Sequence, residues 1–199
     1  KSYAGILKDS LLKDGKEREI AQIISDQTDR LNAFITDFLN FAKTQEPRIV
    51  PSSLEPLLER TVKLVQTQYP KEKYPVEFSP QSQNAIIAMD TQQMEQVFLN
   101  LIINAIQAMP NGGMLKISYI PILETKTIAV IFEDSGKGIT EEDLKNIFKP
   151  FFTTRSDGTG LGLWIVQQII ERHHGKIDVK SSVGKGTLIT VSLPMADRK

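Results

Sequence analysis

Two asparagines, Asn100 and Asn104, lie one helical turn apart in the apolar segment VFLNLIINAIQAM. Residues at this spacing project from the same side of a helix. Their amide oxygens are hard, neutral ligands that suit a Mg²⁺ ion that keeps most of its water and bridges phosphates. By themselves the two asparagines are more typical of the surface of a core helix, and their poor helix propensity shifts this balance only slightly.

The sequence DSGKGI, from Asp134 to Ile139, directly follows the apolar segment IAVIFE. A carboxylate at the end of a strand can accept a hydrogen bond from an exocyclic amino group such as that of adenine, and it would repel the carbonyl oxygen that guanine has there. Gly136 and Gly138 would allow the backbone to approach a flat ring closely. The alternative is an Asp-Ser-Gly turn that closes a strand, which is the commoner meaning of such a sequence standing alone.

A third segment, GTGLGL, places Gly158, Gly160 and Gly162 at the start of a predicted helix. A glycine-rich loop that leads into a helix offers free backbone N–H groups and the positive end of the helix dipole, which together suit phosphate groups. The segment lacks the GK[ST] ending of a Walker loop and the G-x-G-x-x-G spacing of Rossmann and protein-kinase loops. Those folds are therefore not expected.

Upstream of these glycines, the segment FKPFFTTR combines aromatic, hydroxyl and basic side chains. Its members are Phe148, Phe151, Phe152, Thr153, Thr154 and Arg155. We expect the aromatic residues to anchor a mobile lid on the core. Arg155 or Lys149 could reach a phosphate, although either is equally typical of a solvated surface.

Hydrophobic periodicity predicts the elements that must position these side chains. The expected helices cover residues 54–68, 91–109, a short piece from Thr140, and 161–173; the expected strands lie near Val76 and at 85–89, 114–123, 127–133, 176–182 and 187–193. The strands at 114–123 and 127–133 should form a hairpin. This order indicates an α+β fold, a two-layer α/β sandwich with one sheet and helices on one face.

The first 46 residues predict a helical hairpin. Apolar residues recur with helical spacing from 16 to 45, a shorter helix covers 3–11, and Asp14-Gly15-Lys16 supplies the turn. So thin a hairpin should bury its apolar side against a second copy, as a four-helix bundle in a homodimer, and the alternative is packing on the rest of the same chain. Prolines mark a linker at 47–52, so the expected domains are 1–46 and 53–199.

Composition excludes several function classes for this chain of 199 residues. Its 24 basic and 24 acidic residues cancel, which gives no field that would attract nucleic acid or an anionic membrane. It has no cysteine, so disulfides and thiolate chemistry are excluded, and a reducing compartment such as the cytoplasm is favoured. The apolar run at 97–109 is too short to cross a bilayer, and no signal-peptide pattern is present; any membrane attachment would lie outside this chain.

Taken in order, these segments resemble the histidine kinase family, within the superfamily that includes gyrase, MutL and the heat-shock chaperone ATPase. The family's sequence boxes correspond to residues 96–108, 134–138, 148–152, 158–162 and 184–187. The resemblance covers the whole second domain. The compact lid and the ending NAIQAM are most similar to nitrogen-regulation and sporulation kinases.

The resemblance implies an ATP–Mg²⁺ site in which Asn104 binds the metal with help from Asn100, and Asp134 accepts from the adenine amino group. The lid, from Lys149 to Thr159, would close over the triphosphate, while Gly186 would be structural. The residues expected to contact ATP are Asn100, Asn104, Asp134, Gly136, Gly138, Ile139, Lys149, Phe152, Thr153, Thr154, Arg155, Gly158, Thr159, Gly160, Leu161, Gly162 and Thr187.

By the same resemblance, the N-terminal hairpin is the back part of a dimerisation and phosphoacceptor domain. The acceptor histidine and the acidic residue after it are expected just upstream of Lys1, and the phosphoryl group would pass on to an aspartate in the receiver domain of a response regulator. The two histidines present, His173 and His174, end a predicted helix before Gly175, where we expect capping or packing.

Three functions remain open at this point. Relatives that hydrolyse ATP have a glutamate where this chain has Asn100, and an amide cannot take a proton from water, which favours a histidine kinase over an ATPase. Gln107 stands where some members have a lysine or histidine, so that γ-phosphate contact is in doubt. The alternatives are a serine-directed kinase of the same superfamily and a non-enzymatic, nucleotide-binding dimer module. The chain alone should bind ATP–Mg²⁺ without labelling itself.

Overall fold

The computed structural model describes residues 20–25, 27–28, 46–80, 85–155 and 158–196. Residues 20–25 and 27–28 are helical, as the periodicity over 16–45 predicts. The predicted shorter helix at 3–11, the turn after it and the remainder of the long helix lie outside the described residues. Among the described helices, none is both long and apolar enough to span a membrane.

From Val50 onward the elements follow the predicted order, except for the first strand, which was not predicted. They are β1 (Val50–Ser53), α3 (Leu54–Gln66), β2 (Val76–Pro80), β3 (Ile86–Met89), α4 (Thr91–Gln107), β4 (Leu115–Ile122), β5 (Thr127–Asp134), α5 (Glu141–Leu144), α6 (Gly162–Arg172), β6 (Lys176–Ser182) and β7 (Gly186–Pro194). Each predicted helix and strand of this region is present, with ends that agree to within about two residues.

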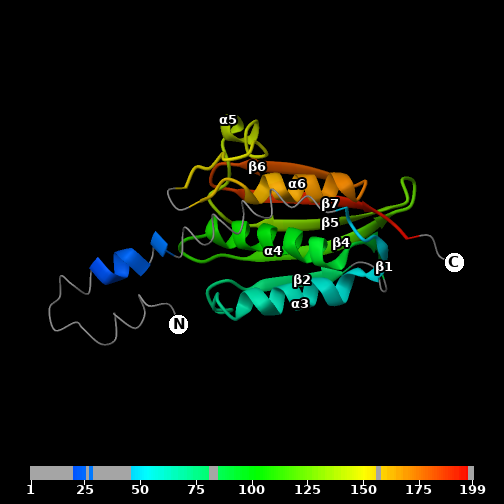
Figure 1. Cartoon of the computed structure of the whole chain (residues 1–199), viewed down its shortest axis with the longest axis horizontal. Helices are drawn as coiled ribbons and strands as arrows, with labels where there is room; N and C mark the ends of the chain where they lie inside the picture. Colours follow the sequence, from blue (N-terminus) through cyan, green and yellow to red (C-terminus); the bar gives the residue numbers. More distant parts are fainter. Residues whose placement is uncertain (1–19, 26, 29–45, 81–84, 156–157, 197–199) are drawn as a thin grey trace.

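The main sheet has five strands in the order β2-β4-β5-β7-β6. β2 and β4 are parallel, whereas the other neighbours are antiparallel, including the predicted hairpin of β4 and β5. Helices α3, α4 and α6 lie side by side on one face of this sheet (Figure 1). The structure therefore confirms the predicted two-layer sandwich.

Alternation along the strands decides which side chains meet the helices. Ile117, Phe132 and Ile189 are paired across β4, β5 and β7, and all three are buried. Phe132 in turn lies 5.9 Å from Phe98 of α4, measured between ring centroids. Burying one such large apolar side chain contributes about 1.5–3 kcal/mol. Because side chains two residues apart share a face, Asp134 also points toward the helix layer.

A second, two-stranded sheet was not expected from the sequence. β1 pairs antiparallel with β3, so that part of the segment predicted to be a linker, 47–52, is a strand. Its prolines are compatible with this position because β1 has β3 as its only strand partner among the described residues, which leaves one edge without ladder hydrogen bonds. The second sheet thus ties the entry of the chain to the segment that leads into α4.

The start of α4 is fixed by Asp90, which is its N-cap residue. Oδ1 of Asp90 accepts hydrogen bonds from the backbone N–H groups of Gln92 and Gln93, at 3.0 and 3.1 Å. Oδ2 accepts from the backbone N–H of Arg48 at 2.9 Å. Burial alone would raise the pKa of Asp90, but these three hydrogen bonds outweigh it and the pKa is lowered. The cap therefore holds α4 and the incoming chain together.

Candidate functional site

Asp134 ends β5 with its carboxylate inside the fold, where 7% of the residue is exposed. Its Oδ1 accepts hydrogen bonds from the backbone N–H of Gly136 at 2.8 Å and from that of Thr187 at 3.3 Å. Burial raises the pKa of this carboxyl, and the two hydrogen bonds oppose the rise. Both donors bind the same oxygen, so Oδ2 takes no part in either bond and remains an acceptor that a ligand could use.

The loop after Asp134 rests directly on the last turn of α4. The backbone N–H of Lys137 donates to the carbonyl oxygen of Ala108 at 3.0 Å, and Ala108 in turn donates to Asn104. A Cβ on Gly136 would lie 2.7 Å from that same Ala108 oxygen, so only glycine fits at this crossing. The structure thus brings the turn that carries Asn104 against the loop that begins at Asp134.

The other asparagine of α4 faces the start of α6. The Oδ1 atom of Asn100 is 3.7 Å from the position that a Cβ on Gly162 would occupy. Both Asn100 and Asn104 are half-buried. α4 therefore directs the Asn100 amide toward the N-terminus of α6, where backbone N–H groups favour an anion, and Asn104 lies one turn further along the same side of the helix.

The predicted lid, 149–159, joins α5 to α6. Thr153 closes a local turn, in which its Oγ1 accepts from the backbone N–H of Arg155 at 3.1 Å. Gly160 has a φ of 70°, and a Cβ there would overlap the backbone of Phe151. The lid is thus connected to α6 through a left-handed residue that only glycine accommodates without strain.

Two side chains, one in the lid and one just after it, lie differently than expected. Phe151 was expected to anchor the lid on the core, but 54% of its surface is exposed and its φ is 65°. Nearby Ile147 is buried instead, at 7% exposure. Leu161 was expected among the ATP contacts, but its side chain is fully buried in the core, so only its backbone could meet a ligand.

The expected role of Gly138 also changes. A Cβ on this glycine, which has a φ of 70°, would overlap the carbonyl oxygen of Ser182 on β6. The need for glycine at this position is therefore explained by its contact with β6. Gly186, expected to be structural, has its Cβ position against the carbonyl oxygen of Asp134 and fits that role.

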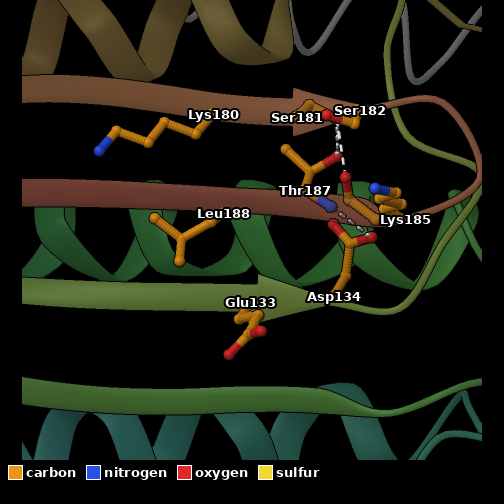
Figure 2. Close-up of a pocket in the computed structure, with 9 residues that line it drawn as sticks. Glu133, Asp134, Lys180, Ser181, Ser182, Lys185, Thr187 and Leu188 are labelled. Carbon is orange, nitrogen blue, oxygen red and sulfur yellow. Dashed lines mark hydrogen bonds between the residues drawn. The ribbon is translucent and has the colours of Figure 1, made fainter.

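A hollow of about 190 Å³ opens at the ends of β5, β6 and β7 (Figure 2). Glu133, Lys180 and Leu188 line it from the face that the helices leave uncovered, because they alternate with residues that face the helices. The full lining is Glu133, Asp134, Lys180, Ser181, Ser182, Lys185, Gly186, Thr187 and Leu188. Pockets for small molecules commonly measure about 300–1,000 Å³. This hollow is therefore not itself large enough for a nucleotide. It borders Asp134 from the side of the sheet that the helices leave uncovered.

Two residues next to the site were not singled out from the sequence. Ser181 of β6 forms hydrogen bonds to both the loop after Gly138 and the start of β7. Asp90 caps the helix that carries the asparagines. An Asp directly before a predicted helix is a recognisable N-cap signal, whereas nothing local distinguishes Ser181 from the serine beside it.

The model of the family of histidine kinase-, DNA gyrase B-, and HSP90-like ATPases matches residues 89–197. These residues include Asn104, Asp134 and the start of α6. The match begins just before α4 and extends past the end of β7, so it covers α4 and every element that follows.

Curated relatives and a solved structure extend the likeness upstream. The chain is 35% identical over 185 residues to the sensor histidine kinase ZraS of Salmonella typhimurium, which covers 93% of this chain and 40% of that protein. It is 34% identical over 188 residues to sporulation kinase E of Bacillus subtilis, covering 93% and 25%. The crystal structure of the histidine kinase ThkA in complex with the response regulator protein TrrA superposes with a TM-score of 0.77 at 26% identity, over 96% of this chain and 55% of that one. The chain therefore spans less than half the length of these two curated relatives.

Proposed function

This chain belongs to the family of histidine kinase-, DNA gyrase B-, and HSP90-like ATPases, and on that premise we propose that it is the ATP-binding catalytic region of a sensor histidine kinase. The observation that carries the proposal is the packing of α4. Its Asn104 turn touches the loop after Asp134 through Ala108, and its Asn100 faces the start of α6. Helix α4, which carries the proposed amide ligand, thus lies against both the loop that follows the Asp134 carboxylate and the N-terminus of α6.

In this proposal Asp134 recognises the adenine base. Its Oδ2 accepts a hydrogen bond from the 6-amino group of adenine, while Oδ1 stays bound to the backbone N–H groups of Gly136 and Thr187. A 6-oxo purine has a carbonyl oxygen at that position, which a carboxylate repels. The two backbone donors keep the carboxylate in place before the nucleotide arrives, so little ordering is required on binding.

The residues of α4 also fit a magnesium ion. The Asn104 side chain is half-buried and supplies one neutral oxygen, which suits a cation that takes its other ligands from phosphates and water. Asn100 assists from the preceding turn. When bound, the ion would neutralise charge on the phosphates. Asn104, with Asn100, would hold the ion, and the N-terminus of α6 would favour the negatively charged phosphates.

The remaining predicted contacts complete the triphosphate site. Lys149, Thr153, Thr154 and Arg155 belong to the lid, and Gly158 to Gly162 connect it to the helix N-terminus. Phosphoryl transfer requires positioning and charge stabilisation more than covalent help, which is what such a lid supplies. Phe152 and Ile139 contribute apolar surface near the base or the lid.

Asn100 favours transfer of the phosphoryl group to another acceptor over transfer to water. A carboxylate at this position could take a proton from an attacking water, whereas an amide cannot. His173 does not fit the acceptor role. It is 1% exposed; its Nε2 accepts from the backbone N–H of Asp90 at 3.0 Å, so Nδ1 carries the proton and donates to the carbonyl oxygen of Ile169 at 2.8 Å. In this proposal the acceptor is the histidine that the family resemblance implies, in a segment outside this sequence.

The partners we propose are a second copy of the chain and the receiver domain of a response regulator. The helical residues Ile20, Ile23 and Ile24 each expose more than half of their surface, which supports pairing of the N-terminal hairpin, 1–46, with another hairpin. The superposition with ThkA, solved in complex with a response regulator protein, supports the second partner. Residues 53–199 would then form the catalytic domain.

Calorimetric titration with ATP tests the site directly. Asn104→Ala should weaken Mg²⁺-ATP binding at least about tenfold but leave binding in EDTA nearly unchanged, because the lost ligand acts through the metal. Asp134→Ala should weaken binding about 10- to 100-fold with or without Mg²⁺, the size expected for a hydrogen bond to a charged group.

The matched control is Gln92→Ala, which removes an exposed amide from the first turn of α4. It should bind ATP like the wild type. If the wild-type chain does not bind ATP, or if Asn104→Ala and Gln92→Ala behave alike, the proposed site is wrong. Incubation of the chain with γ-labelled ATP should leave the protein unlabelled, and a label on His174 would contradict an acceptor outside this sequence.

A further inference from the structure

A row of polar side chains crosses the sheet at the end of β5 and faces the helix layer. Ser181 of β6 pairs with Thr187 of β7, and Thr187 pairs with Asp134 of β5. Figure 2 shows Ser181, Thr187 and Asp134 one after another on three adjacent strands, joined by hydrogen bonds. The proposed contact of Asp134 with the base does not account for a serine on β6, next to Thr187 and on the side away from Asp134.

The Ser181 hydroxyl has three partners. It accepts from the backbone N–H of Ile139 at 2.9 Å, donates to the carbonyl oxygen of Gly186 at 2.8 Å, and lies 3.0 Å from Oγ1 of Thr187. A serine hydroxyl has one proton to donate and two lone pairs to accept with. All of its hydrogen-bonding capacity is therefore used.

These partners decide which hydroxyl is the donor in the Ser181–Thr187 pair. The backbone N–H of Ile139 can only donate, and the carbonyl oxygen of Gly186 can only accept. The single proton of Ser181 is thus directed to Gly186, and the Thr187 hydroxyl must donate to Ser181. Thr187 then has only lone pairs left for its other side.

We propose that Ser181 is a positioning residue that orients the Thr187 hydroxyl as an acceptor and thereby sharpens discrimination for a 6-amino purine against a 6-oxo purine. This inference rests on the proposed nucleotide site. With Thr187 held this way, its Oγ1 on β7 and Oδ2 of Asp134 on β5 are acceptors on two residues that are paired across the sheet. An exocyclic amino group has two N–H donors to offer to such a pair, whereas a 6-oxo group presents a third acceptor to two others.

Removal of the Ser181 hydroxyl frees the Thr187 proton. In Ser181→Ala the Thr187 hydroxyl can rotate and donate to a 6-oxo group, so the rejection of 6-oxo purines weakens. A purely structural role for Ser181 predicts something else. Loss of its contacts to Ile139 and Gly186 would loosen the loop and lower the affinity for every nucleotide by the same factor, with no change in selectivity.

The experiment compares the affinities of the full chain for Mg²⁺-ATP and Mg²⁺-ITP, which differ at the 6-position. The wild type should prefer ATP, and Ser181→Ala should reduce the ATP/ITP affinity ratio about three- to tenfold, as expected for one hydrogen bond. Ser181→Thr keeps a hydroxyl on a residue type suited to strands and should retain the wild-type ratio.

The control is Ser182→Ala, the neighbouring serine, whose side chain is exposed and points to the other face. It should leave the ratio unchanged. Thr187→Val removes the second hydroxyl of the Ser181–Thr187 pair without altering Ser181, and it should also lower the ATP/ITP affinity ratio. Adding Ser181→Ala to Thr187→Val should not lower this ratio further. This second variant keeps the test decisive if Ser181→Ala does not fold.

The outcomes separate the two claims. An ATP/ITP ratio that Ser181→Ala leaves at the wild-type value, while wild type binds and prefers ATP, would overturn the role of Ser181 and leave the nucleotide site intact. An additional loss of selectivity in the double variant would also overturn it. A wild-type chain that binds neither nucleotide would instead remove the proposed function itself.

Discussion

At the scale of single residues, buried polar groups connect distant parts of the fold. His173 ends α6, yet its Nε2 accepts from the backbone N–H of Asp90, 83 residues away, at the start of α4. Burial lowers the pKa of His173, although its hydrogen bond to Ile169 and the nearby charge of Asp90 oppose this. A buried imidazole of this kind stays neutral where an exposed one would be charged.

This arrangement predicts a pH-dependent stability. Because the folded pKa lies below the unfolded value of 6.5, His173 stabilises the fold fully above pH 6.5, and this contribution is lost as the pH falls below it. The loss is at most about 1.4 kcal/mol per pH unit. The free energy of unfolding, measured with urea at pH 7.5 and 5.5, should therefore fall more between the two pH values for the wild type than for His173→Gln. His174→Gln, at the exposed neighbour, should decline like the wild type; equal slopes in all three proteins would contradict the assignment.

At the scale of elements, α4 organises the site because each of its ends is tied to another segment. Asp90 caps its N-terminus and holds the backbone of Arg48, while Ala108 at its C-terminal end accepts from the loop after Asp134. The two asparagines lie between these fixed ends. A helix held at both ends presents its side chains with little freedom, which favours binding of an ion and phosphates.

The cap of α4 gives a second prediction. Asp90→Ala removes the acceptor of three backbone N–H groups and should lower the free energy of unfolding by about 0.5–2 kcal/mol. Asp90→Asn keeps an oxygen that can cap the helix and should recover most of the loss. Chemical denaturation measures both. If the Asn variant is as unstable as the Ala variant, charge and not the cap hydrogen bonds would be responsible.

The lid gives a third prediction. Gly160→Ala introduces both a left-handed alanine and an overlap with the backbone of Phe151, so it should weaken ATP binding and destabilise the chain. Gly184→Ala is the matched control, because Gly184 has a similar φ of 74° but nothing within 4 Å of its Cβ position. Gly184→Ala should lower the free energy of unfolding by about 1 kcal/mol, the cost of a left-handed alanine, and should bind ATP with wild-type affinity. Equal ATP affinities of the two variants would show that the contact with Phe151 does not matter for binding.

At the scale of the whole molecule, the sandwich has a helix-covered face and an uncovered one (Figure 1). The candidate site lies at the end of the strands on the covered side, where α4, which packs against α6, meets the loop after β5. The helical residues 20–25 and 27–28 precede this domain and expose isoleucines. An exposed apolar stripe on a thin helical segment favours association of chains.

The proposed dimer follows from that stripe. Ile24→Asp places a charge on it and should shift the chain toward a monomer, as measured by sedimentation velocity over a range of concentrations. Leu123→Asp is the control, since Leu123 is 76% exposed in the turn between β4 and β5. It should leave the molecular mass unchanged. A wild-type chain that sediments as a monomer at all concentrations would refute dimerisation.

Local pattern was sufficient for most of the elements and for the residue types of the candidate site. The helical spacing of Asn100 and Asn104, the strand that ends at Asp134 and the glycines that precede α6 are all properties of short segments. Periodicity and turn chemistry act over a few residues, so such features can be derived without knowing what packs against them. The strands, the helices and the two-layer arrangement follow in the same way.

Contacts between remote segments decided the rest. β1 forms because β3 is available as a partner, Gly138 needs to be glycine because β6 lies against it, and Gly160 needs to be glycine because the backbone of Phe151 lies against it. Ser181 reaches Ile139 across 42 residues of sequence. Which groups meet across such separations depends on the register of the sheet and on the packing of whole elements, and no local pattern specifies either.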